Sequence, residues 1–432
     1  MTIHAADPGA DADVSRLDTI PESWPQPLTV GLTPGEVAQM LVWRRELHAE
    51  PELSTQENDT QAWLRATLTD MGMDRVATCG GTGLVVRLGR GEIPRVLLLR
   101  ADMDALPLDE QTGLAFASKR PGAMHACGHD AHMAVLLAVG RRLRVHEDDL
   151  RGTVILCFQP AEERSIGALA MIGEGMLDGR LPLLEGLKVQ HALGLHVWSQ
   201  LATGVISAAA GPVMAAVDEF TITVRGRGGH GAVPQSTADA VVAAAAVVQA
   251  LQTIASRRTD PLDPVVVTVG SIHGGDAFNV IAEEVILRGT VRSYSKNLGQ
   301  RLPGLVADIA QAAAAVHGAK AETRYVRHAI ALHNDPVMAH LVATAAAAAQ
   351  GVTRVDRHLR LMAGEDMAYV LDAVPGCYFF VGCGGPDAEP HHSPRFTVDE
   401  AALPIAAAVM LRAVVSYFGD DDLEPHRPGA ML

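Results

Sequence analysis

Short apolar runs alternate with amphipathic helical segments along most of the chain, and this alternation restricts the fold more than any other feature of the sequence. Continuous apolar runs at residues 95–104, 153–163 and 187–198 are separated by segments with helical periodicity, such as residues 36–52 and 131–146. Runs of this kind are typical of strands that are buried on both faces of a sheet. The sequence therefore predicts an α/β domain in which helices flank a mixed, mostly parallel sheet.

The pattern changes near Gly211, where a second architecture begins. Residues 218–228 alternate between apolar and polar side chains with a period of two, as a half-exposed antiparallel strand does. The segments that follow predict the order β-α-β-β-α-β, which is that of a ferredoxin-like α+β domain. The expected elements are a helix at 238–255, strands at 264–275 and 283–295, a helix at 302–318 and a strand at 320–328.

The first pattern resumes after about residue 330, so the simplest interpretation is one domain inserted into another. We expect a flexible N-terminal tail at residues 1–34, a discontinuous large domain at 35–211 and 330–432, and an inserted domain at 212–329.

Charge and composition exclude several classes of protein. The chain has 50 acidic and 35 basic side chains, a net charge of −15, which disfavours nucleic acid and anionic membrane surfaces as partners. No uninterrupted apolar stretch has the roughly 18 residues of a membrane span, and the N-terminus lacks the pattern of a signal peptide. The five cysteines form no CxxC pair, which is typical of a reducing compartment, so we expect a cytoplasmic protein.

The densest cluster of chemically versatile side chains is the run HACGHDAH at residues 125–132. Thiolate and imidazole are the usual ligands of zinc-like ions. Cys127 and His129 are the better candidates because they lie in the loop before a predicted helix, whereas His132, one turn later, is expected beside the site.

Carboxylates follow two of the predicted strands directly. Asp102 and Asp104 end the first, and Glu162 and Glu163 follow the second. The carboxyl ends of parallel strands are where α/β sites form. We expect Asp104 to orient a metal-bound histidine, whereas Asp102 fits either a site residue or an exposed turn. Of the two glutamates, one suits a metal ligand and the other a general base.

Further histidines stand at other strand ends. His196 lies in the run GLHVW, and the pair His391 and His392 follows the strand at 376–384. The residues themselves do not choose between the two members of the pair. With Cys127, His129, a glutamate and His196, one late histidine gives five ligands, which suits two ions sharing a bridging ligand.

In their order along the chain, these motifs resemble those of a known family. The shared motifs are HACGHDAH, RADMDALP, QPAEE, GLHVW, GRGGHGAVP, FNVI, GTVRSY, GEDMAY and HSPRF. They resemble the dinuclear metallohydrolases of the aminoacylase/carboxypeptidase group, in the branch of hippurate hydrolase, indole-acetyl-amino-acid hydrolases and bacterial N-acyl-amino-acid amidohydrolases. The likeness runs from about residue 38 to 418, and a cysteine in place of aspartate in ACGHD is specific to that branch.

The resemblance implies roles for individual residues. Glu162 would be the general base, and Asp104 would contact a metal ligand without binding metal itself. The metal ligands would be His129, Glu163, His196, His392 and, as a bridge between the two ions, Cys127. In the inserted lid and dimerisation domain, His230 would stabilise the oxyanion, often from the partner subunit, and Asn279 and Arg292 would hold substrate. Two divalent ions per chain (Zn, Mn, Ni or Co) and a homodimer formed through the inserted domain are implied in the same way.

The expected activity is metal-dependent hydrolysis of the amide bond of an N-acyl amino acid or a related small conjugate. A dipeptidase or carboxypeptidase with the same metal centre is the alternative enzyme, and a ligand-binding protein on this fold is the alternative without catalysis. The chain departs from the family at Arg164, Ser165, Ile166, Gln235, Ala282 and Met367, which leaves the acyl preference open.

Overall fold

The computed structural model describes residue 28, residues 31–89 and residues 93–419. It divides into two compact units, which are described separately below. The larger comprises the described residues up to 211 together with 333–359 and 369–419, and the smaller comprises 212–332 and 360–368. Most of the tail expected at residues 1–34 lies outside the described residues. Its last residues belong to the start of the first long helix, where Thr33 forms a capping box with Glu36.

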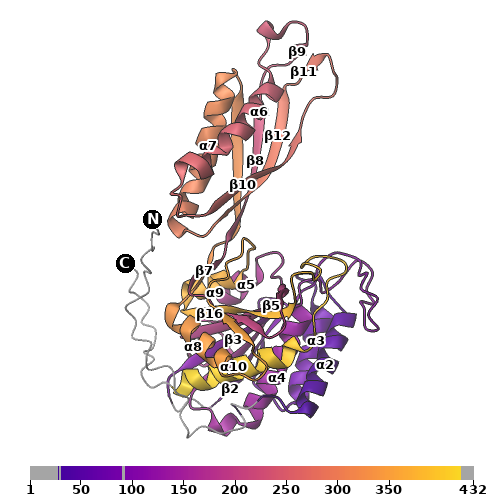
Figure 1. The fold of residues 1–432 in the computed structure, drawn as a ribbon, viewed down its shortest axis with the longest axis vertical. Helices are drawn as coiled ribbons and strands as arrows, with labels where there is room; N and C mark the ends of the chain where they lie inside the picture. The colour runs from indigo at the N-terminus through magenta and orange to yellow at the C-terminus, as the bar shows by residue number, and fades with distance from the viewer. Residues whose placement is uncertain (1–27, 29–30, 90–92, 420–432) are drawn as a thin grey trace. The chain divides into compact units, whose positions relative to one another are not determined.

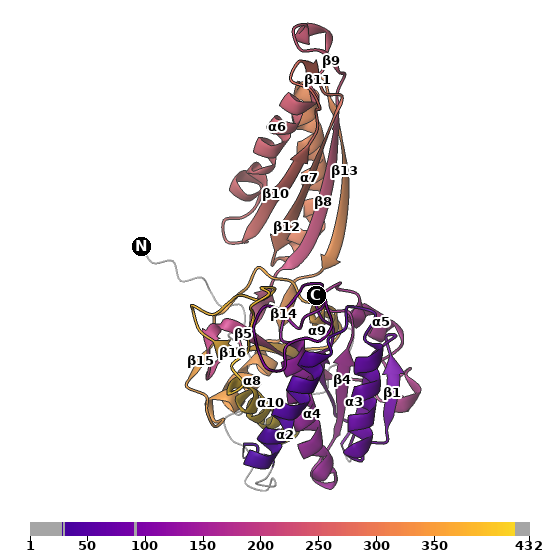
Figure 2. The ribbon, with the colours of Figure 1, turned by 90° about the vertical axis from the view of Figure 1, so that its right-hand side faces the viewer.

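The larger unit is built on an eight-stranded mixed sheet in the order β1-β2-β4-β3-β5-β16-β6-β15 (Figures 1 and 2). Its four central strands, β4, β3, β5 and β16, are parallel to their neighbours within that group. The strands are β1 (Val76–Cys79), β2 (Gly83–Leu88), β3 (Val96–Asp102), β4 (Thr153–Gln159), β5 (His191–Ala202), β6 (Val205–Ser207), β15 (Arg354–Asp356) and β16 (Gly376–Gly384). All seven residues of β3 and of β4 are buried, which explains their continuous apolar sequence.

Helices cover this sheet, and the predicted α/β architecture is confirmed. They are α2 (Pro34–Ala49), α3 (Asn58–Asp70), α4 (His129–Val145), α5 (Gly167–Gly173), α8 (Pro336–Ala347), α9 (Met367–Ala373) and α10 (Ala402–Gly419). Helix α10 is long and apolar enough to cross a membrane, but 72% of its most apolar window is buried. It packs against α4 and α8, so its composition is that of a core helix.

The smaller unit has the predicted ferredoxin-like order of elements. Its four strands pair antiparallel in the order β10-β12-β8-β13, and helices α6 (Ala240–Leu251) and α7 (Lys296–Val316) supply its core together with the sheet. The strands are β8 (Ala216–Arg225), β10 (Val265–His273), β12 (Glu284–Ser293) and β13 (Lys320–Ala329). A second pair, β9 (Gly229–His230) and β11 (Val280–Ile281), forms a small separate sheet.

Residues 360–368 differ from the expected domain organisation, which placed them in the large domain. In the structure they pack with the smaller unit. The physical reason is backbone pairing: the Leu361 N–H donates to the Val213 carbonyl at 2.8 Å, and the Ala215 N–H donates to the Ala363 carbonyl at 2.9 Å.

A buried ionic network lies between α2 and α4. His48 Nδ1 is 2.8 Å from Asp130 Oδ2, and its Nε2 is 3.2 Å from Glu110 Oε1. Arg44 Nε donates to the same Asp130 oxygen at 2.8 Å. Burial alone would lower the pKa of His48, but the two carboxylates outweigh both burial and the charge of Arg44 and raise it to about 9.

This network predicts a pH-dependent contribution to stability. Because the pKa of His48 is raised above its ordinary 6.5, its contribution is present in full below pH 6.5 and is lost as the pH rises through 9. The shift corresponds to about 3 kcal/mol. Urea unfolding should give a lower free energy of unfolding at pH 10 than at pH 6 in the wild type. The part of this decrease that comes from His48 should be absent in His48→Gln. Replacement of the exposed His273 should leave the pH dependence of the unfolding free energy as in the wild type. If His48→Gln lost as much unfolding free energy between pH 6 and pH 10 as the wild type, His48 would not be its source.

Candidate metal centre

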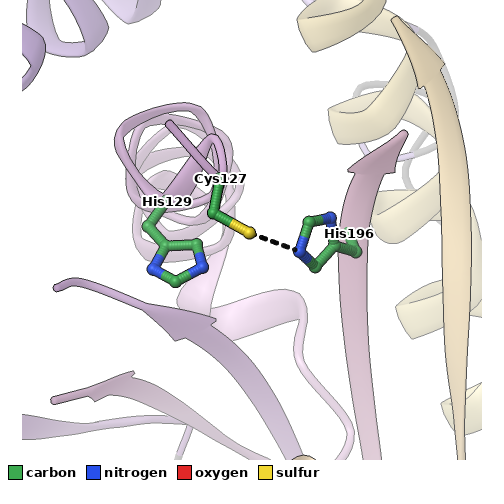
Figure 3. A group of neighbouring side chains, drawn as sticks. All are labelled: Cys127, His129 and His196. Carbon is green, nitrogen blue, oxygen red and sulfur yellow. Dashed lines mark hydrogen bonds between the residues drawn. The ribbon is translucent and has the colours of Figure 1, made fainter. Parts of the chain in front are cut away.

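The predicted ligands meet at the carboxyl ends of the central parallel strands. Asp102 ends β3, and Glu162 and Glu163 follow β4. Cys127 and His129 come from the loop and first residue of α4, and His196 lies on the adjacent strand β5 (Figure 3). One ligand atom from each of Cys127, His129 and His196 lies within 4.8 Å of the others, and all three residues are buried.

Gly128 allows Cys127 and His129 to point into the same space. Its φ of 88° is in the left-handed region that side chains with a Cβ rarely adopt. A Cβ at this position would lie 2.5 Å from Cγ2 of Val197, the residue after His196. The glycine is therefore required both by the backbone conformation and by the close approach of β5.

Gly128→Ala should consequently lower both stability and metal content. The left-handed conformation alone costs about 1–2 kcal/mol for a residue with a side chain, and the contact with Val197 adds to that cost. Thermal unfolding and metal analysis of the purified variant measure the two effects. Gly385→Ala is a suitable control because its Cβ would meet no atom within 4 Å. Normal metal content in Gly128→Ala would show that this backbone does not hold the ligands in place.

Two buried atoms in the cluster have no hydrogen-bond partner within the described part of the chain. They are His129 Nε2 and Glu163 Oε1, which lie 3.9 Å apart. His129 Nδ1 already donates to the Asp104 carbonyl at 2.8 Å, so the other nitrogen faces the cluster. Buried polar atoms normally make hydrogen bonds, and an imidazole nitrogen beside a carboxylate oxygen, both without hydrogen bonds, suits a cation.

The electrostatics of the cluster also call for positive charge. Burial opposes a charged His129, yet Asp102, Asp104 and Glu163 raise its pKa to about 10. Burial, together with the charges of Glu163, Glu162 and Asp102, raises the pKa of the Cys127 thiol well above its usual range. A divalent ion would supply the missing charge in place of these protons, so the residues fit a metal centre.

The two late histidines have different surroundings. His392 Nε2 is 3.5 Å from Glu163 Oε1, and its backbone N–H donates to the Ala126 carbonyl at 2.9 Å, next to Cys127. His391 Nε2 instead donates to the Val197 carbonyl at 2.9 Å, and its ring stacks on Trp198. This geometry favours His392 as the ligand, the choice that the residues alone left open.

Asp104 fixes the backbone that carries the paired glutamates. Its carboxylate accepts the Glu162 N–H at 3.2 Å, the Glu163 N–H at 3.1 Å and the Ser54 hydroxyl at 2.6 Å. Burial would raise the pKa of Asp104, but His129 and Ser54 hold it below the usual value. One residue thus links the histidine side of the cluster to the glutamate side.

Asp102 and His132 form a support that the motifs did not specify. Asp102 is fully buried, which removes the exposed-turn alternative, and its Oδ1 is 2.6 Å from His132 Nδ1. His132 Nε2 accepts the Val197 N–H at 2.9 Å, so both its nitrogens are engaged. Arg100, also buried, donates to the other oxygen of Asp102 at 2.7 Å. The sequence predicted His132 beside the site and left the role of Asp102 open, but it did not predict that the two side chains pair with each other or with Arg100.

The remaining candidates lie in the smaller unit and do not form one cluster. His230 in β9 pairs with Val280 in β11, and Asn279 precedes that pair, so these two residues are neighbours. Arg292 stands near the opposite end of β12, eight residues beyond Glu284. At about 3.3 Å per residue, eight residues of strand span roughly 26 Å. His230 and Arg292 of one chain are therefore far apart within the same unit.

Comparison with known proteins gives the family. Residues 98–416 match the profile of peptidase family M20/M25/M40. An N-acetyl-L-cysteine deacetylase of Bacillus subtilis (strain 168) is 38% identical over 366 residues, 84% of this chain and 85% of the relative. The IAA-amino acid hydrolase ILR1-like 4 of Arabidopsis thaliana is 37% identical over 382 residues, 87% of this chain and 84% of the relative.

A solved structure gives the same result. The YxeP protein of Bacillus subtilis, described as a dinuclear metal binding peptidase of the M20 family, superposes with a TM-score of 0.76 at 32% identity, covering 89% of this chain and 98% of that one. The resemblance inferred from the motifs is thereby confirmed. Since the family match spans most of the chain and the relatives align along most of their lengths, the chain belongs to peptidase family M20/M25/M40 and is a metal-dependent amidohydrolase.

Proposed function

We propose that the chain hydrolyses the amide bond of N-acyl amino acids at a centre that holds two divalent ions. The observation that carries the proposal is that Cys127 belongs to two groups of possible ligands, one with His129 and His196 and the other with Glu163 and His392. A sulfur shared by two groups suits a bridging ligand. Zinc, manganese, nickel and cobalt all suit thiolate, imidazole and carboxylate, so the native ion depends on supply.

Glu162 is the proposed general base. It is buried and directly precedes the proposed ligand Glu163, and its backbone is fixed by Asp104. When bound, divalent ions polarise the substrate carbonyl and make a water more acidic. The Glu162 carboxylate accepts the proton of the attacking water and later donates it to the leaving amine. His230 donates to the carbonyl oxygen as negative charge develops there.

The amino-acid half of the substrate is proposed to bind in the smaller unit. The guanidinium of Arg292 suits the free carboxylate of an N-acyl amino acid because it can donate two parallel hydrogen bonds. Asn279, next to His230, is proposed to hold the substrate near the reacting carbonyl.

The placement of these residues supports a homodimer. One small substrate cannot reach both His230 and Arg292 of one chain, because His230 lies in the β9–β11 pair, which directly precedes the start of β12, whereas Arg292 lies near the end of β12. We therefore propose that His230 acts in the active site of a partner subunit. Mixing His230→Ala with Glu162→Gln should restore about a quarter of wild-type activity, since half of the dimers are mixed and each has one complete site. No recovery after subunit exchange, or a fully active monomer in light scattering, would contradict this arrangement.

The proposed cellular location is the cytoplasm, which the five buried cysteines, none of them in a disulfide, support.

A substrate screen with metal analysis of the same preparation tests the proposed activity. N-acetyl and N-benzoyl amino acids should be hydrolysed to a carboxylate and an amino acid. Faster cleavage of dipeptides would favour a dipeptidase or carboxypeptidase. Failure on the whole panel with zinc, manganese, nickel or cobalt added would contradict hydrolysis of this substrate class.

A further inference from the structure

Glu57 is a fully buried carboxylate that belongs to none of the possible ligand groups. It stands at the N-cap position of α3, but its side chain makes no hydrogen bond that caps this helix. Glu52 supplies the cap instead, because its Oε2 accepts the Thr60 N–H at 2.8 Å and the Thr60 hydroxyl at 2.9 Å. Burying a carboxyl group is costly unless its oxygens accept hydrogen bonds, so the contacts of Glu57 indicate its role.

Both oxygens of Glu57 accept hydrogen bonds, and one of the donors adjoins the proposed general base. Oε1 accepts the Thr55 N–H at 3.0 Å and the Ala161 N–H at 2.9 Å, and Oε2 accepts the Thr82 hydroxyl at 2.6 Å. Ala161 is 104 residues away in the sequence and directly precedes Glu162. Glu57 therefore joins the start of α3 to the turn that carries Glu162.

The two backbone donors to Oε1 both adopt a conformation that is unfavourable for their residue types. The φ angle is 71° at Thr55 and 52° at Ala161, in the left-handed region. Residues with a side chain persist there only where the surrounding structure holds them. The Ala161 carbonyl is held by the N–H groups of Ile166 and Gly167, each at 3.3 Å, and the Ala161 N–H is held by Glu57.

Asp104 holds the next N–H along the chain. The Ala161 N–H donates to Glu57 Oε1 at 2.9 Å, and the Glu162 N–H donates to Asp104 Oδ1 at 3.2 Å. Two successive N–H groups are thus each bound to a buried carboxylate from a different segment of the chain. Together these bonds fix the backbone from which the Glu162 side chain projects.

We propose that Glu57 is a positioning residue that keeps the Glu162 carboxylate aimed at the attacking water. It acts through the Ala161 backbone and does not touch the substrate. This inference rests on the proposed function, in which Glu162 is the general base. Since the donors are backbone N–H groups, the role requires a side chain of the right length with an acceptor oxygen, and it does not require a negative charge.

Two substitutions of Glu57 separate its length from its charge. Glu57→Asp keeps the charge but is one methylene shorter, so its carboxylate should lose Ala161 and cap α3 instead, as aspartate commonly does at this position. It should fold stably and lose about 10- to 100-fold in kcat with little change in KM, because a displacement of about 1 Å can cost 10²-fold in rate. Glu57→Gln keeps the length and an acceptor oxygen, so it should retain most of the wild-type kcat. An unchanged kcat in Glu57→Asp, or equal losses in both variants, would overturn the proposal.

Glu52→Ala is the matched control for these variants. It removes another buried carboxylate from the same segment, one that accepts hydrogen bonds from Thr60 on α3 and not from Ala161. It should lower Tm but retain the wild-type kcat per metal-loaded site. A loss of kcat as large as that in Glu57→Asp would overturn the proposal, because any disturbance of this segment would then have the same effect.

Hydrogen exchange distinguishes failure of this inference from failure of the proposed function, since it does not depend on turnover. In peptides that contain Ala161, exchange should be faster in Glu57→Asp than in the wild type and in Glu57→Gln. If the exchange rates followed this order but the wild type hydrolysed no N-acyl amino acid, the proposed activity would be refuted and the link from Glu57 to Ala161 would stand. Equal exchange in all three proteins would refute the link itself.

Discussion

Glu162→Gln is expected to reduce kcat by about 10²–10⁴-fold, the usual contribution of general acid–base catalysis, while the enzyme keeps its metal. The amide has nearly the shape of the carboxylate but cannot accept the proton of the attacking water. Asp104 accepts a hydrogen bond from the Glu162 backbone N–H, not from its side chain, so the loop should keep its position. Steady-state kinetics and metal analysis of one preparation measure both quantities.

Glu163→Gln is the matched control for this variant. It makes the same chemical change one residue later, where Oε1 is buried and faces His129 Nε2 at 3.9 Å and His392 Nε2 at 3.5 Å. It should lose metal as well as activity. Near-normal turnover in Glu162→Gln would show that Glu162 is not the general base. If Glu162→Gln lost its metal and Glu163→Gln kept it, Glu162 would be the metal ligand and Glu163 the general base.

Cys127→Ala is expected to lose most of the bound metal and with it the activity. The thiol is buried, its Sγ lies 3.4 Å from His196 Nε2, and it belongs to both proposed ligand groups. If Cys127 bridges two ions as proposed, alanine would remove one ligand from each of them. Loss of even a residue that only supports metal ligands typically costs about 10- to 100-fold in affinity, and loss of a shared ligand should cost more.

Two further substitutions separate loss of the ligand from loss of packing. Cys383→Ala also truncates a buried cysteine, but one that belongs to no possible ligand group, so it should lower stability and keep the metal. Cys127→Asp should recover part of the metal content, because a carboxylate can also bridge two divalent ions. Retention of two ions per chain by Cys127→Ala would contradict the bridging role.

The sequence predicted most of the elements that position the site. Strands β3, β4 and β5 were recognisable because continuous apolar runs of this length are buried on both faces of a sheet. Strands β6 and β15 were not predicted, because each has only three residues, too few to show a period. The pairing of residues 360–368 with the smaller unit depends on backbone hydrogen bonds to distant residues, which leave no mark on the local sequence.

The candidate site, like the fold, could be predicted from the sequence only in part. Cys127 and His129 were predicted from the dense cluster before a helix, and the glutamate pair from its position directly after an apolar strand, where α/β sites form. The choice between His391 and His392 required tertiary structure, because it depends on which ring reaches Glu163 and which stacks on Trp198. The link from Asp102 through His132 to Val197 joins three distant segments, so sequence spacing could not reveal it.

The most direct test of the central claim is a metal titration of the chelator-stripped enzyme during hydrolysis of an N-acetyl amino acid. The rate should be negligible without metal, should rise with added zinc, manganese, nickel or cobalt, and should reach a plateau when two ions are bound per chain. Full activity in protein from which metal analysis detects no ion would contradict the account.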